Sequence, residues 1–142
     1  MTQETVYKQS GVIAYRGRPG DDTGQLEVLL ITSRSRKRWV IPKGLVEFHL
    51  SPRQSAIEEA YEEAGIEGEV SPEAVGRFSY EKWAGLCQVE VFVMRVDNML
   101  DDWPEAYFRT RRWFSVEEAA GKVREAELAE LIRSLPRLLG NE

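Results

Sequence analysis

The sequence has little of what several common kinds of protein require. Its 142 residues contain one cysteine, Cys87, which cannot form an internal disulfide. Cys87 occupies an apolar position in the strand-like run "LCQVEVFVM", so we interpret it as a small core residue and not as a nucleophile. No apolar run approaches the length of a transmembrane helix, and the start "MTQETVYKQS" has no signal-peptide core. These absences predict a cytoplasmic protein without a membrane partner.

Positive charge is also in short supply, and it is unevenly distributed. The net charge is −5, which argues against a stable nucleic-acid partner. Residues 33–43, "SRSRKRWVIPK", and residues 108–113, "FRTRRW", are nevertheless basic and contain no acidic residue. Taken singly, each is typical of a solvated loop. Together with the acidic segment described below, they are candidates for an anion-binding surface.

The composition is that of one globular domain, which we place at residues 1–142. Hydrophobic residues make up 42% of the chain and charged residues 30%. Strands are predicted at 6–16, 26–32, 39–42, 75–81, 88–96 and 111–114, and helices at 52–64, at 115–123 with Ser115 and Glu118 as a capping box, and through 128–135 up to Pro136. This order predicts an α/β fold with helices on both faces of a mixed sheet.

The helix predicted at 52–64 is unusually acidic on one side. Ser51 and Gln54 have capping-box spacing, and Gly65 is a natural C-terminal stop. At about 100° per residue, one face carries apolar side chains and is expected to pack. The members of that face are Ala56, Ile57, Ala60, Tyr61 and Ala64, and the opposite face carries Glu58, Glu59, Glu62 and Glu63.

This arrangement of glutamates costs helix stability. Glu58 with Glu62, and Glu59 with Glu63, are like-charged i,i+4 pairs, each destabilising by about 0.2–0.5 kcal/mol on an exposed helix. They lie toward the C-terminal end, where the helix dipole disfavours anions. We therefore expect a compensating cation, either an arginine from elsewhere in the chain or a bound divalent metal ion. A merely solvated acidic face is the open alternative.

Residues 44–66, "GLVEFHLSPRQSAIEEAYEEAGI", resemble the Nudix box, G-x5-E-x7-R-E-U-x-E-E-x-G-U, in which U is aliphatic. The matching positions are Gly44, Glu59, Glu62, Glu63, Gly65 and Ile66. The preceding "RWVIPKG" is similar to the segment that leads into the box in this family. Residues 101–119, "DDWPEAYFRTRRWFSVEEA", are similar to the diphosphoinositol polyphosphate phosphohydrolases of the family.

The resemblance implies a Nudix-type α/β/α sandwich and a hydrolase that cleaves a phosphoanhydride bond. The implied substrates are a dinucleoside polyphosphate, an inositol pyrophosphate or another nucleoside diphosphate derivative. The implied cofactor is Mg²⁺ or Mn²⁺, held by the carbonyl of Gly44 and by Glu59, Glu62 and Glu63. Glu59 and Glu63 are both candidates for the catalytic base. Glu47 is either an outer ligand or a surface acid.

Two positions depart from the box. Leu50 stands where the family has glutamate, and Glu58 stands where it has arginine. In the family this arginine pairs with box glutamates and orients them, so the resemblance implies that this chain lacks that contact. We expect Glu58 to raise the negative potential at Glu59 and Glu62. The alternative function is therefore a catalytically impaired Nudix domain that acts as a sensor or binding module for a phosphorylated ligand.

The two basic segments acquire a role from this resemblance. The guanidinium group of an arginine can bind two phosphate oxygens at once, so the basic side chains are candidates for binding the substrate. They are Arg34, Arg36, Arg38, Lys43, Arg109, Arg111 and Arg112. We interpret Trp39, Trp83 and Trp113 as core residues, with base stacking as the alternative, and His49 as a loop residue. The oligomeric state is not predicted.

Overall fold

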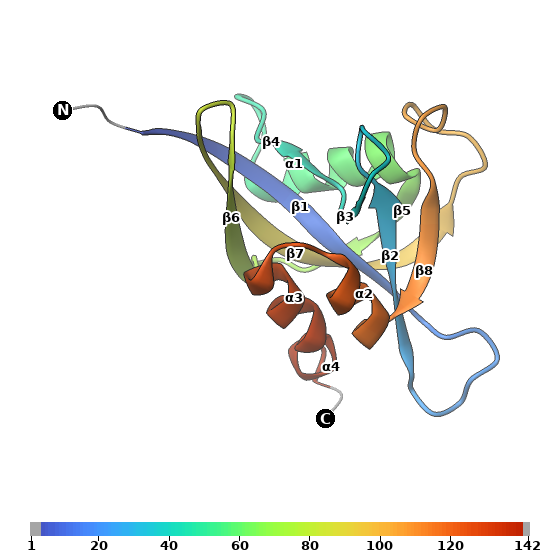
Figure 1. Ribbon diagram of the computed structural model, residues 1–142. Helices are drawn as coiled ribbons and strands as arrows, with labels where there is room; N and C mark the ends of the chain where they lie inside the picture. Colours follow the sequence, from blue (N-terminus) through green and yellow to red (C-terminus); the bar gives the residue numbers. More distant parts are fainter. Residues whose placement is uncertain (1–3, 141–142) are drawn as a thin grey trace.

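The computed structural model describes residues 4–140, and a mixed sheet forms its centre (Figure 1). The long strands β1 (Thr5–Gly17) and β7 (Gly85–Met99) pair in parallel in the middle of the sheet. The remaining pairs are antiparallel, and the strand order is β3-β2-β1-β7-β5, with β4 pairing β1, β6 pairing β7 and β8 pairing β2. These strands are β2 (Leu26–Thr32), β3 (Trp39–Val40), β4 (Lys43–Leu45), β5 (Ile66–Val70), β6 (Gly76–Lys82) and β8 (Arg111–Ser115).

Helices cover both faces of this sheet. The acidic segment forms α1 (Pro52–Glu59), continued by the π-helical turn η1 (Ala60–Ala64), on one face. The other face is covered by α2 (Val116–Lys122), α3 (Ala126–Arg133) and α4 (Leu135–Leu138), shown in orange and red in Figure 1. None of the helices in residues 4–140 is long and apolar enough to cross a membrane.

Successive side chains of a strand point to opposite faces of the sheet, so the protein has two separate hydrophobic cores. In β1, Val12 and Ala14 pack beneath α1 and η1, while Ile13 between them packs beneath α2 and α3. The first core contains the helix alanines and the second contains Phe78, Leu128 and other large side chains. The predicted α/β/α sandwich with a mixed sheet is confirmed.

Helix boundaries follow the capping signals, with one exception. Ser51 and Gln54 form the predicted capping box of α1, as Ser115 and Glu118 do for α2. The helix predicted to run up to Pro136 ends earlier, at Arg133, and Pro136 lies in the first turn of the separate short helix α4. Proline is tolerated in the first turn of a helix, where its missing N–H has no intrahelical partner.

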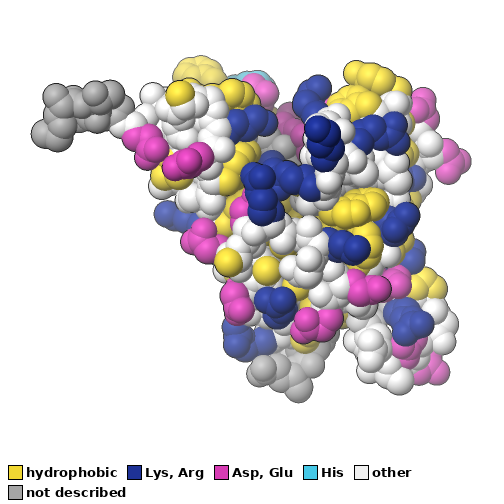
Figure 2. Space-filling view, in the orientation of Figure 1, with side chains coloured by type: hydrophobic (Ala, Val, Ile, Leu, Met, Phe, Trp, Pro, Cys, Tyr) yellow, Lys and Arg dark blue, Asp and Glu magenta, His cyan; other side chains and the backbone are white. Residues whose placement is uncertain are grey.

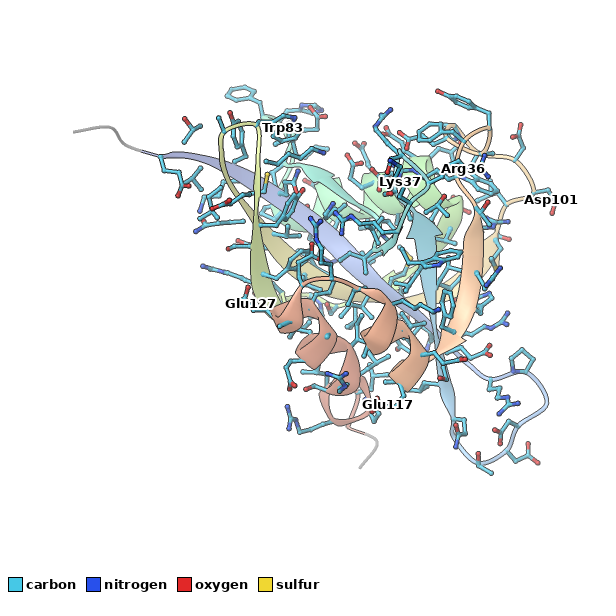
Figure 3. The ribbon with its side chains drawn as sticks, in the orientation of Figure 1. Arg36, Lys37, Trp83, Asp101, Glu117 and Glu127 are labelled. Atoms are coloured by element: carbon cyan, nitrogen blue, oxygen red, sulfur yellow. The ribbon has the colours of Figure 1, made fainter. Side chains whose placement is uncertain are left out.

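Two aromatic residues are more exposed than the sequence predicts. Tyr61 is 40% exposed, because the buried stripe of the helix runs through the three alanines and Tyr61 lies to its side. Trp83 is 49% exposed, and with Ala84 it forms the tip of the β6–β7 hairpin, where both have positive φ values near 55° (Figure 3). A two-residue turn at the end of a hairpin cannot reach the core.

The other single-residue interpretations hold. Trp39 and Trp113 are half-buried against the two cores, and Cys87 is fully buried. His49 lies exposed in the loop before α1. The short strands β4 and β5 were not predicted, because "KGL" has only three residues and "IEGEV" has glycine at its centre and two glutamates, which are depleted in strands.

Candidate active site

A cavity of about 350 Å³ opens beside the acidic helix, and charged side chains of both signs line it. Its walls come from the loop after β2, from β4, from α1 and η1, from the β6–β7 hairpin and from the loop between β7 and β8. In Figure 2, Lys and Arg side chains gather around the hollow between the upper left and upper right parts of the molecule. The acids of the cavity are Glu47, Glu59, Glu63 and Glu105, and the cations are Arg34, Arg38, Lys43, Lys82 and Arg109.

The four glutamates of the helix do not share one face. Glu59 and Glu63 line the cavity, whereas Glu58 and Glu62 are exposed and line a separate surface hollow beside Tyr61. The pairs diverge because the buried alanine stripe turns the 59/63 edge toward β4 and leaves the 58/62 edge facing solvent. Glu62 therefore does not line the cavity, although, after burial, its negative charge still helps to raise the pKa of Glu59.

Gly44 allows the carboxylate of Glu59 to approach the backbone of β4. A Cβ atom at position 44 would lie only 2.6 Å from Oε1 of Glu59. Any side chain at this position would push the carboxylate away. The glycine therefore places the Glu59 carboxylate beside the main chain of Gly44, as a shared ligand site requires.

Glu63 is held on both carboxylate oxygens. Its Oε1 accepts a hydrogen bond from the backbone N–H of Lys43 at 3.1 Å, and its Oε2 lies 3.2 Å from Nη2 of Arg109. Arg109 is 8% exposed, contacts Oε1 of Glu105 at 2.8 Å and donates to the carbonyl of Thr32 at 2.8 Å. The prediction of a compensating arginine from elsewhere in the chain is confirmed for Glu63.

The loop between β7 and β8 also caps the acidic helix. The carbonyls of residues 62–65 at the end of a helix lack intrahelical partners. They accept hydrogen bonds, in order, from the Glu105 N–H at 3.1 Å, Trp103 Nε1 at 3.0 Å, Arg111 Nη1 at 2.8 Å and the Leu100 N–H at 2.8 Å. One loop thus fixes the end of the helix and delivers Glu105 and Arg109 to the cavity.

The predicted basic residues divide into two groups. Arg34, Arg38, Lys43 and Arg109 line the cavity, and Arg36, Arg111 and Arg112 do not. Arg111 is used in the helix cap described above, the guanidinium of Arg112 lies over the ring of Trp39, and Arg36 donates to Thr110 outside the cavity. Lys82 lines the cavity although no sequence signal distinguished it from an ordinary solvent-facing lysine of a strand.

Comparisons with known proteins agree with this arrangement. A model of the NUDIX domain matches residues 10–135, which include every residue that lines the cavity except Gln9. The chain belongs to the Nudix family. Its curated relatives are Nudix hydrolases, and this assigns the protein to the hydrolases.

Individual relatives show how far the similarity reaches. Nudix hydrolase 12, mitochondrial, of Arabidopsis thaliana is 31% identical over 150 residues, covering 94% of this chain and 74% of that protein. Diphosphoinositol polyphosphate phosphohydrolase 3-alpha of Mus musculus is 33% identical over 115 residues, covering 79% and 66%. The chain spans about half the length of two other curated plant Nudix hydrolases. A crystal structure of a C. elegans Ap4A hydrolase binary complex superposes with a TM-score of 0.80 at 25% identity, covering 96% and 99%.

The Nudix helix carries two carboxyl groups with strongly raised pKa values. Burial, and next the negative charge of Glu63, raise the pKa of Glu59 to about 8. Burial raises the pKa of Glu63 to about 7, although Arg109 and the Lys43 N–H oppose the shift. Besides burial, the negative charge of Glu58 raises the pKa of Glu62, as predicted, whereas the charges that act most on Glu59 are those of Glu63 and Glu62. The site therefore attracts protons or cations.

These shifts predict an unusual pH dependence of stability in metal-free protein. A carboxyl group whose pKa is raised on folding stabilises the folded state below its unfolded pKa of about 4.5, and this stability is lost as pH rises to the folded pKa. We expect Tm to fall by about 5–10 °C between pH 5 and pH 8.5. Glu59→Gln should flatten this slope and Glu58→Gln, on the solvent side, should keep it. A Tm of the wild type that stays level over this range contradicts the raised pKa values.

The side chains present fit a hard divalent cation. Gly44 supplies a carbonyl, and Glu59 and Glu63 supply carboxylates, all oxygen donors of the kind that Mg²⁺ and Mn²⁺ prefer. Mg²⁺ in particular uses one or two carboxylates and completes its shell with water and substrate phosphate. Within residues 4–140, no three Asp, Glu, His or Cys side chains converge on one metal position. The site is thus suited to a cation that substrate helps to hold.

Proposed function

We propose that the protein is a metal-dependent pyrophosphohydrolase that cleaves a phosphoanhydride bond in a highly phosphorylated substrate. The observation that carries the proposal is the meeting of two walls in one cavity. The acidic wall contains the Nudix carboxylates Glu59 and Glu63, and the basic wall contains Arg34, Arg38 and Lys43. Such a cavity holds a chain of phosphates along the cations and brings one anhydride bond to the carboxylates.

The two carboxylates take different roles. When Mg²⁺ or Mn²⁺ is bound by Glu59, Glu63 and the Gly44 carbonyl, it neutralises phosphate charge and lowers the pKa of a water molecule. Glu63 is the oriented ligand, because both of its oxygens already have fixed partners. Glu59 has no hydrogen bond or ion pair within the described residues, so its carboxylate is the group that accepts the proton of the attacking water.

Lys43 occupies the boundary between the two walls. Burial lowers the pKa of its ammonium group, while the nearby Glu63 opposes this shift. Its Nζ lies 4.8 Å from the centre of the Tyr80 ring, which fixes the side chain over one side of the cavity. In the proposed complex, Lys43 contacts a phosphate of the substrate.

The basic wall favours substrates with several phosphates. A dinucleoside polyphosphate, an inositol pyrophosphate and other nucleoside diphosphate derivatives all meet this requirement, and the relatives named as Ap4A and diphosphoinositol polyphosphate hydrolases support the same range. The location that we propose is the cytoplasm, although some relatives are named mitochondrial or chloroplastic.

The experiment that tests the proposal is a turnover assay of purified protein against these three classes of substrate with Mg²⁺ and with Mn²⁺. We expect metal-dependent release of phosphate or nucleotide from at least one class. The alternative is a binding module, favoured by Leu50 and by the outward direction of Glu58 and Glu62. Tight binding of a polyphosphate by folded, metal-saturated protein without turnover would establish the module and exclude the enzyme.

The basic wall predicts an effect that depends on phosphate chain length. Arg38→Ala and Lys43→Ala remove cations from the cavity, so they should raise KM by about tenfold or more for longer chains and less for shorter ones. Arg36→Ala is the matched control, since Arg36 lies outside the cavity on the same loop (Figure 3). Steady-state kinetics on a series of nucleoside polyphosphates measures both. An equal rise of KM at every chain length contradicts a phosphate-binding wall.

A further inference from the structure

The substitution of the box arginine raises the question of how the remaining glutamates are held. Position 58 carries Glu58, which is exposed and faces away from the cavity. Leu50, at the other altered position, supplies no carboxylate to pair with a cation. Arg53, the basic side chain of the Nudix helix, donates to the carbonyls of Val70 and Ser71 and so does not orient Glu59 or Glu63.

A cation nevertheless contacts the site, and it comes from another part of the chain. We infer that Arg109, in the loop between β7 and β8, is a positioning residue that performs the task of the missing box arginine. This inference rests on the proposed function. Arg109 does not touch the reacting phosphates in this scheme; it acts through Glu63.

The contacts of Arg109 suit orientation better than binding of substrate. Its guanidinium bonds to Glu63, to Glu105 and to the carbonyl of Thr32, at distances of 2.8–3.2 Å. Its side chain is 5% exposed, against 74% for Arg34 at the mouth of the cavity. A buried fork with three fixed acceptors has few donors left for a phosphate.

The anchoring of the loop makes this position rigid. Glu105 and Arg111, on either side of Arg109, both bind the end of the Nudix helix through its carbonyls. The segment from Glu105 to Arg111, which contains Arg109, is therefore attached at both ends to the helix that carries Glu63. Glu63 is held between the Arg109 fork and the Lys43 N–H, so its remaining lone pairs point in one direction.

The test compares Arg109→Gln and Arg109→Lys with a matched control. The control is Arg95→Gln, which breaks an exposed Arg–Glu pair with Glu69 on the edge of the sheet. The readouts are kcat and KM with saturating metal, the Mg²⁺ dissociation constant of the metal-free protein by calorimetry, and the folded fraction by circular dichroism.

We expect Arg109→Gln to lower kcat and to weaken Mg²⁺ binding by about 10–100-fold each, with KM within about threefold of the wild type. Arg109→Lys keeps the charge but loses the fork, so an intermediate loss of kcat is expected. A merely structural arginine would lower the folded fraction and leave kcat and Mg²⁺ affinity of the folded molecules unchanged. Arg95→Gln should match the wild type throughout.

The inference and the proposed function fail in different ways. If the wild type has no turnover, the proposed function is wrong, and the calorimetric comparison still decides the role of Arg109. If the wild type turns over and folded Arg109→Gln retains its kcat and Mg²⁺ affinity within about twofold, the inference is overturned. Should Arg109→Gln fail to fold, the same criterion applies to Arg109→Lys.

Discussion

Replacing Glu59 by glutamine is expected to lower kcat by about 10²–10⁴-fold, the range that general base catalysis contributes in other enzymes. Glutamine has nearly the same shape and cannot accept the proton of the attacking water. The carboxylate of Glu59 packs against Gly44, so the substitution leaves the packing of the cavity wall intact. Steady-state kinetics at saturating Mg²⁺, with Tm as a control for folding, measures the effect.

The same substitution at two other positions of the helix makes the result specific. Glu58→Gln, on the solvent side, should leave kcat unchanged. Glu62→Gln distinguishes two expectations. The box spacing makes Glu62 a metal ligand, whereas the structure places Glu62 outside the lining of the cavity. The geometry predicts a kcat within about threefold of the wild type for Glu62→Gln. If Glu59→Gln also retains wild-type turnover, Glu59 is not the proton acceptor.

Local sequence signals were sufficient for most of the fold. The capping pairs Ser51–Gln54 and Ser115–Glu118 start helices where they were expected, because each depends on residues three positions apart. The long strands were visible from their apolar runs. The interpretation of Trp83 as a core residue is wrong because Trp83 lies in the turn that joins the strands predicted at 75–81 and 88–96, where its side chain is 49% exposed.

The box spacing predicted the acids Glu59 and Glu63 of the candidate site, and the basic segments predicted four of its cations without showing which of their members line the cavity. Gly44, Glu59 and Glu63 come together because a fixed helix follows a short loop. The ion pair of Arg109 with Glu63 joins residues 46 positions apart, in the loop that follows β7. No local pattern determines such a contact; it depends on how the loop crosses the end of the helix. For the same reason Arg38 and Arg36, two residues apart, could not be assigned to opposite sides of the cavity wall.

Replacing Gly44 by alanine is expected to lower kcat by about 100-fold or more while Tm changes by only a few degrees. The backbone of Gly44 pairs with Ser10 in the regular ladder between β4 and β1, and its φ lies outside the left-handed region, so alanine is compatible with the main chain. The new Cβ meets the carboxylate of Glu59, at the end of a flexible side chain. That carboxylate moves away at little cost to folding, and a displacement of about 1 Å is costly to catalysis.

Gly17→Ala is the control for this prediction, because a Cβ at the end of β1 meets no atom within 4 Å. It should leave both kcat and Tm unchanged. The two variants together distinguish a glycine that gives the carboxylate room from one that only ends a strand. The decisive measurement is kcat per folded molecule. If the loss of activity in Gly44→Ala is no larger than the loss of folded protein, Gly44 has a structural role. The proposal that Gly44 and Glu59 form a shared ligand site is then contradicted.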